Sequence, residues 1–174
     1  MGLDMHLYKK IYVGEHYEHN GIKSEVKVHK TDKDGNVKTV SLDEPICSIS
    51  IEVGYWRKAN AIHGWFVKNI QEGNDDCGTY DVDVSQLKDL RDLCSKILTE
   101  YEIHEKLMGD KPRALAEKLL PPTSGCFFGS YEYDEDYIQD LKDTVEIIDK
   151  AVEGYEKNEA DGFTWVDFQY SSSW

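Results

Sequence analysis

The chain has 174 residues, of which 40% are hydrophobic and 31% charged, and its formal net charge is −14. Such a length is typical of one domain, and the charge makes direct binding to DNA or RNA unfavourable because phosphates would be repelled. No apolar run reaches the roughly 20 residues of a membrane span, and residues 1–6 lack the basic and apolar regions of a signal peptide. We therefore expect a cytoplasmic protein that contacts neither nucleic acid nor a membrane.

The amino-terminal third predicts β-structure. Apolar and polar residues alternate over residues 3–8, which is typical of a half-buried strand. Residues 22–41 predict a β-hairpin, because Asp34-Gly35 supplies the turn between two valine-containing segments. Its lysine-rich face should be exposed, so we expect the hairpin to project from the domain. Residues 46–51 indicate a short buried strand or the lead-in to a helix.

The central segment, residues 52–70, is the richest in chemical groups. On a helix, one face would carry apolar residues that form a buried stripe: Tyr55, Ala59, Ile62, Phe66 and Ile70. A second row would flank this stripe: Trp56, Asn60, His63 and Val67. The opposite side would carry Arg57, Gly64 and Lys68. We therefore expect a helix over residues 54–71 with a polar edge next to the core.

The rest of the chain predicts a short strand around Tyr80 and then a helix over residues 85–101 capped by Ser85. Pro121 and Pro122 should stop any further helix, and Asp134 or Asp136 should start a helix over residues 135–153. Residues 163–170 predict a last strand, inside the sheet and beside the first. The predicted fold is a single α+β domain. It has a mainly antiparallel sheet of the N- and C-terminal strands plus a hairpin, packed with three principal helices.

Standard catalytic and cofactor signatures do not occur. The chain has no phosphate-binding loop, dinucleotide fingerprint, nucleophile elbow or His-Glu-x-x-His motif. Its cysteines are far apart and predict reduced thiols rather than a zinc site: Cys47, Cys77, Cys94 and Cys126. The sequence therefore predicts no metal ion and no cofactor.

A candidate site combines three polar segments: the flank of the central helix, the acidic loop at Asp75-Asp76, and the glycine-framed loop 124–130. The loop glycines would let the backbone approach a flat ligand closely. The ligand-binding candidates are Trp56, Arg57, Asn60, His63, Ser124, Phe127, Phe128 and Ser130. Catalysis would need His63 as general acid or base, tuned by Asp75 or Asp76. The competing interpretation is that His63 and the tryptophans belong to the core.

Several segments resemble a family of small proteins encoded by phages, prophages and their bacterial hosts. The segments are Gly2–Lys10, Val53–His63 with Trp65-Phe66, Asp75–Gly78, and Ser124–Ser130 followed by Glu132-Tyr-Asp134. The chain departs from the family's usual sequence at His6, where tyrosine is usual, and at Cys126, where phenylalanine is usual. The resemblance implies an accessory gene of mobile elements, hence a role in host takeover or anti-defence in the host cytoplasm.

Three functions remain open from the sequence. The first is a non-enzymatic binding protein that engages a host protein or a small anionic, nucleotide-like ligand. The second is a small hydrolase or transferase that acts on a nucleotide-like substrate with His63 and Asp75 or Asp76. The third is an acidic mimic of nucleic acid that occupies a nucleic-acid-binding partner. A homo-oligomer is compatible with each of them.

Overall fold

The structure is a computed structural model that describes residues 2–13, 26–40, 46–104, 110–125, 127–161 and 164–174. Its fold is α+β, as predicted, with an antiparallel four-stranded sheet and a separate two-stranded hairpin. The elements in chain order are β1 Asp4–Tyr12, β2 Val28–Thr31, β3 Val37–Val40, β4 Ser48–Arg57, α1 Asn60–Asn69, β5 Thr79–Val82, α2 Val84–Ile103, α3 Asp110–Leu119, α4 Glu135–Asp161 and β6 Val166–Ser173.

The large sheet has the strand order β4-β1-β6-β5. The last strand therefore lies inside the sheet and beside the first, as predicted. Alternate side chains of β1 and β6 face the helices, and the largest of them are fully or almost fully buried, as is Leu3 just before β1: Met5, Leu7, Phe168 and Tyr170. This alternation follows from the period of two in a β-strand, so one face of each strand supplies the core.

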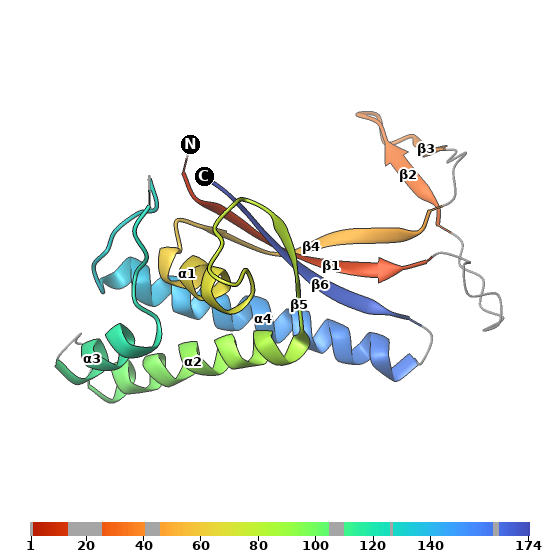
Figure 1. The fold of residues 1–174 in the computed structure, drawn as a ribbon. Coiled ribbons are helices and arrows are strands. Elements are labelled where there is room, and N and C mark those ends of the chain that lie inside the picture. The colour runs from red at the N-terminus through yellow and green to blue at the C-terminus, as the bar shows by residue number, and fades with distance from the viewer. Residues whose placement is uncertain (1, 14–25, 41–45, 105–109, 126, 162–163) are drawn as a thin grey trace.

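Helices α1, α2 and α4 lie on one face of the sheet, and α2 runs alongside α4 (Figure 1). The predicted helices over 85–101 and 135–153 are confirmed as parts of α2 and α4. The structure has a fourth helix, α3, so the expectation of three principal helices was incomplete. Pro112 lies in the first turn of α3, where the missing N–H has no intrahelical partner to lose. No helix among the described residues is long and apolar enough to cross a membrane.

The predicted helix over 54–71 was wrong in its first part. Strand β4 continues to Arg57, and α1 begins only at Asn60. The change of structure occurs at Lys58, whose φ of 63° lies in the left-handed region. Pairing with β1 overrides the helical periodicity here, because residues of β4 complete the sheet next to Leu3–Leu7. Tyr55 is consequently 46% exposed rather than part of a buried stripe.

The helix starts also differ in detail from the prediction. Asp83, not Ser85, is the N-cap of α2, and it forms a capping box with Gln86. Asp134 precedes α4, and its carboxylate accepts a hydrogen bond from the Tyr137 N–H at 3.0 Å. Of the two predicted helix-start residues, Asp134 rather than Asp136 therefore caps α4.

Strands β2 and β3 form the predicted hairpin within the described part of residues 22–41. The turn is held by the Asp32 carboxylate, which accepts hydrogen bonds from the N–H groups of Asp34 and Asn36, each at 2.9 Å. The hairpin lies away from the helices at the far end of the molecule (Figure 1), and most of its residues are exposed. Ile51, in the stretch predicted to be buried, is 41% exposed, so this part of the prediction was wrong.

Candidate functional site

His63 lies in the core of the protein. Its side chain has no exposed surface, and both ring nitrogens have partners. Nδ1 lies 2.8 Å from the Tyr170 hydroxyl, and Nε2 lies 3.1 Å from Oδ2 of Asp75. Burial raises the pKa of Tyr170, so its hydroxyl stays protonated and can donate to Nδ1. The Nε2–H then donates to Asp75, so neither nitrogen is left to act on a substrate.

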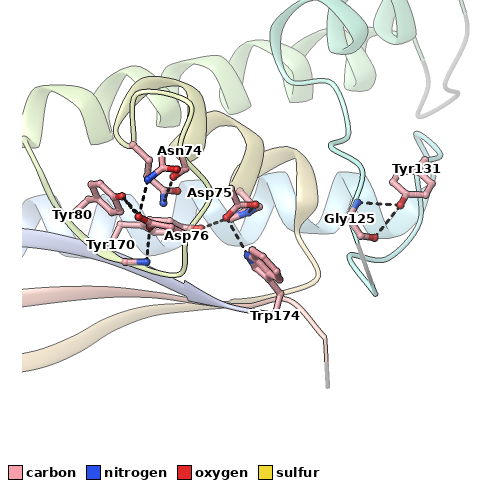
Figure 2. A network of polar contacts seen from close by, with 11 residues as sticks. Asn74, Asp75, Asp76, Tyr80, Gly125, Tyr131, Tyr170 and Trp174 are labelled. Atoms are coloured by element: carbon pink, nitrogen blue, oxygen red, sulfur yellow. Dashed lines mark hydrogen bonds and ion pairs between the residues drawn. The ribbon is translucent and has the colours of Figure 1, made fainter.

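Asp75 connects this pair to the carboxyl-terminal residue. Its second oxygen, Oδ1, accepts a hydrogen bond from Nε1 of Trp174 at 3.0 Å (Figure 2). The acidic loop, the end of β6 and the middle of α1 are thereby joined through polar contacts. This is the arrangement of a structural network in which His63, Asp75, Tyr170 and Trp174 supply one another's hydrogen-bond partners.

Asp76 points to a different set of partners. Its carboxylate accepts hydrogen bonds from Asn74 Nδ2 at 2.7 Å, from the Gly78 N–H at 2.9 Å and from the Tyr80 hydroxyl at 2.9 Å (Figure 2). The contact with Asp76 raises the pKa of Tyr80. Cys77 lies inside this turn with a φ of 57° and is exposed. These bonds hold the loop between α1 and β5, and Asp76 makes no contact with His63.

Asn60, the first residue of α1, fixes the glycine-framed loop. Its Nδ2 donates to the carbonyl oxygens of Phe128 at 3.2 Å and Ser130 at 2.7 Å. Its Oδ1 accepts a bond from the Thr123 N–H at 3.3 Å. Only 5% of Asn60 is exposed, so its hydrogen-bonding groups are used almost wholly inside the protein. The central helix and the glycine-framed loop therefore lie together, as the sequence predicts.

The two phenylalanines of the loop have opposite environments. Phe128 is 3% exposed, and its ring lies edge-on to His63 with 5.2 Å between the ring centroids. Phe127 is 70% exposed and has a φ of 63°, an uncommon value for a bulky residue. The Tyr131 hydroxyl lies 3.3 Å from both the N–H and the carbonyl oxygen of Gly125, which bridges the base of the loop (Figure 2). The loop thus holds one aromatic ring inside and presents the other to solvent.

A polar cleft of about 350 Å³ lies next to this loop. Its lining comes from the end of β4 and the start of α1, from the loop, and from the first turns of α4. The lining includes two cations, Arg57 and Lys58, and four carboxylates: Glu132, Asp134, Asp136 and Asp140. Gly129 packs closely on Lys58: a side chain at position 129 would place its Cβ only 3.1 Å from the lysine Cβ. The excess of carboxylates gives the cleft a negative charge.

Asp140 has the most perturbed carboxyl group of the cleft. Burial, followed by repulsion from the nearby carboxylates Asp143, Asp136 and Asp134, raises its pKa to about 7. Asp134 is also structural, since its Oδ2 accepts a hydrogen bond from the Ser130 hydroxyl at 3.1 Å. In the part of the chain that the structure describes, these carboxylates do not form a group that could hold a metal ion.

The structure divides the residues predicted for the site. Arg57, Asn60 and Ser130 line the cleft, while Ser124 and Phe127 are exposed on the adjoining loop. Trp56 is buried, and its Nε1 donates to the Thr144 hydroxyl at 2.9 Å. Trp56 and Arg57 point to opposite faces because they are neighbours on a strand, not on a helix.

Sequence reasoning missed the carboxylates that dominate the cleft. Glu132, Asp134 and Asp136 form an acidic run directly after the glycine-framed loop, and Asp140 follows one turn later on α4. In the sequence, Asp134 and Asp136 stand out only as candidate starts of a helix. The proximity of this run to the loop in sequence was the signal that could have included it in the site.

Comparison of the chain with protein-family models, curated proteins and solved structures gave no match. The functional interpretation therefore depends on the geometry of the molecule itself.

Proposed function

We propose that this protein is a non-enzymatic binding protein that engages a partner protein through the loop 127–131 and the adjoining cleft. The observation that carries the proposal is Phe127, which is 70% exposed and has a left-handed backbone conformation. Such a conformation costs roughly 1–2 kcal/mol for a residue with a Cβ. A strained backbone that exposes a large aromatic ring is costly for folding, and it is useful where the ring enters a partner's pocket.

The cleft indicates which chemistry the partner offers beside that pocket. The cleft is lined by four carboxylates, among them Asp136 and Asp140, and by two cations, Arg57 and Lys58. A lysine or arginine side chain of the partner would gain the attraction of the carboxylates. A small anionic ligand would meet net repulsion, so we favour a protein over a nucleotide-like molecule. The family resemblance suggests that the partner is a protein of the host.

The other two hypotheses have less support. An enzyme built on His63 would need a ring nitrogen open to substrate, and both nitrogens have partners within 3.1 Å. A nucleic-acid mimic would need an uninterrupted row of carboxylates. Several carboxylates of α4 are instead paired with cations of α2 or of α4 itself: Lys88–Glu156, Arg91–Asp149, Lys150–Glu146 and Lys157–Glu153.

The test is capture of partners from a host lysate on the immobilised protein, followed by titration calorimetry with the purified candidate. We expect the natural chain to retain a specific host protein, and Phe127→Ala to weaken its binding by at least about tenfold, typical of an aromatic hot spot. Asp136→Lys should weaken it as well, because it reverses a charge of the cleft wall.

Trp165→Ala is the matched control, because Trp165 is 71% exposed but lies in the segment before β6, near Tyr12. This variant should bind as the natural chain does. If Trp165→Ala and Phe127→Ala weaken binding equally, or if neither does, the loop is not the binding surface and the proposal is wrong.

A further inference from the structure

Strand β4 forms an edge of the large sheet along ten residues, Ser48–Arg57. Among the described residues it pairs only with β1. Natural proteins usually protect such an edge with a charged residue, a proline or a very short strand. The first part of β4, Ser48-Ile-Ser-Ile51, has no charge and no proline, and Ile51 is 41% exposed. The edge is therefore open to pairing with another strand.

The direction of the backbone groups follows from the ladder with β1. The Val13 N–H donates to the Cys47 carbonyl oxygen at 3.0 Å, and the register continues with Ile11 opposite Ile49. Backbone groups alternate in direction along a strand. Ile49 thus bonds toward β1, and the N–H and C=O groups of Ser48, Ser50 and Glu52 point toward the open side.

We propose that this edge binds the same edge of a second copy of the chain, with the two β4 strands antiparallel about a two-fold axis at Ser50. The proposal is independent of the cleft and its partner. In this register, Ser50 lies opposite Ser50, and Ser48 lies opposite Glu52 of the second copy. The outward N–H groups of each strand then meet outward C=O groups of the other, and the two sheets become one continuous sheet.

The side chains of the segment are complementary to themselves in that register. Ile49 of one copy lies opposite Ile51 of the other, so two apolar cross-strand pairs form. The one charged side chain, Glu52, lies opposite a serine and already bonds Nδ1 of His6 at 2.8 Å. No like charges are brought together among Ser48–Glu52, and the two-fold pairing uses both β4 edges, so no β4 edge is left for a third copy. This self-complementarity is the reason to choose a second copy over an unrelated strand.

The experiment is sedimentation equilibrium of the full chain at increasing protein concentration, with hydrogen–deuterium exchange of β4 measured at both ends of the range. We expect the mass to rise toward twice the 20.0 kDa of one chain. The Ser50 and Glu52 amides should exchange quickly when dilute and slowly when concentrated.

Two variants test the edge directly. Ile51→Lys should weaken self-association by at least about tenfold, because it places a charge in the apolar pair. Val37→Lys is the matched control: it adds the same charge at a residue that is 66% exposed on the separate hairpin, and it should leave self-association unchanged. Ser50→Pro removes an outward N–H without breaking the ladder to β1, and it should abolish association.

Three results would overturn the proposal. One is a single-chain mass up to about 1 mM protein, a concentration at which even weak specific dimers form. Another is equal weakening by Ile51→Lys and Val37→Lys, which would indicate a general effect of charge. The third is association without protection of the Ser50 amide, which would place the interface away from the β4 edge. The lysine variants and the exchange measurement decide the matter even if Ser50→Pro does not fold.

Discussion

Phe127 and Phe128 are neighbours in sequence, yet they belong to two different regions of the molecule. Phe128 faces inward and completes a network in which His63 has no free hydrogen-bonding group. Phe127 faces outward beside a cleft whose carboxylates exceed its cations. Aromatic residues of one short segment can therefore be either structural or exposed to solvent. Burial and the presence of partners separate the two roles.

Phe128→Ala should have the largest effect on stability. Removing a ring that is only 3% exposed should lower the free energy of unfolding by about 3–5 kcal/mol, since it leaves a cavity next to His63. Chemical denaturation measures this loss. An effect below about 1 kcal/mol would show that Phe128 is not part of the core.

His63→Ala should have the next largest effect. It leaves the buried Tyr170 hydroxyl and the Asp75 carboxylate without their shared partner, which should cost roughly 1–3 kcal/mol. His29→Ala is a suitable control, because His29 is exposed on the hairpin and its removal should cost less than about 0.5 kcal/mol. Partner binding by the folded fraction of His63→Ala should be retained. A stable His63→Ala variant that has lost partner binding would show that His63 acts in binding rather than in core packing.

Phe127→Gly should change stability in the opposite direction. Glycine adopts a positive φ without strain, so roughly 1–2 kcal/mol is recovered, and about 0.5–1 kcal/mol of this is lost to the greater freedom of the unfolded chain. Thermal denaturation should show a net gain of roughly 0–1.5 kcal/mol. Phe127→Ala keeps the Cβ and the strain, so its stability should stay near that of the natural chain. Destabilisation by both variants would show that the exposed ring supports the fold.

Asp140→Asn should alter how stability depends on pH. The folded-state pKa of about 7 is above the ordinary value of 3.8, so the folded state favours the protonated carboxyl. The resulting stabilisation is present below about pH 4 and is lost as the pH rises through 7. The asparagine variant lacks this loss and should become more stable relative to the natural chain between pH 4 and 8. Urea unfolding at several pH values measures the difference. Asp89→Asn on the exposed side of α2 should show no such trend, and parallel pH curves for Asp140→Asn and the natural chain would contradict the assignment.

Sequence patterns alone identified much of the fold. The alternation over residues 3–8 and the apolar periods of residues 85–101 and 135–153 reflect burial of one face of each element, which is encoded locally. The turn at Asp34-Gly35 is local too, because its conformation depends on adjacent residues. These elements formed where they were expected.

Only the tertiary structure decided the central segment and the site. Residues 54–57 have a helical pattern of apolar positions, but pairing with β1 fixes them as a strand. The environment of His63 depends on Tyr170, which is distant in sequence and reaches it only when β6 enters the sheet. The cleft likewise forms because Lys58 and Asp140, more than 80 residues apart, line the same hollow. Contacts at long sequence separation leave no periodic signal in either partner, so the sequence could nominate residues such as His63 and Asn60 but could not decide which were buried.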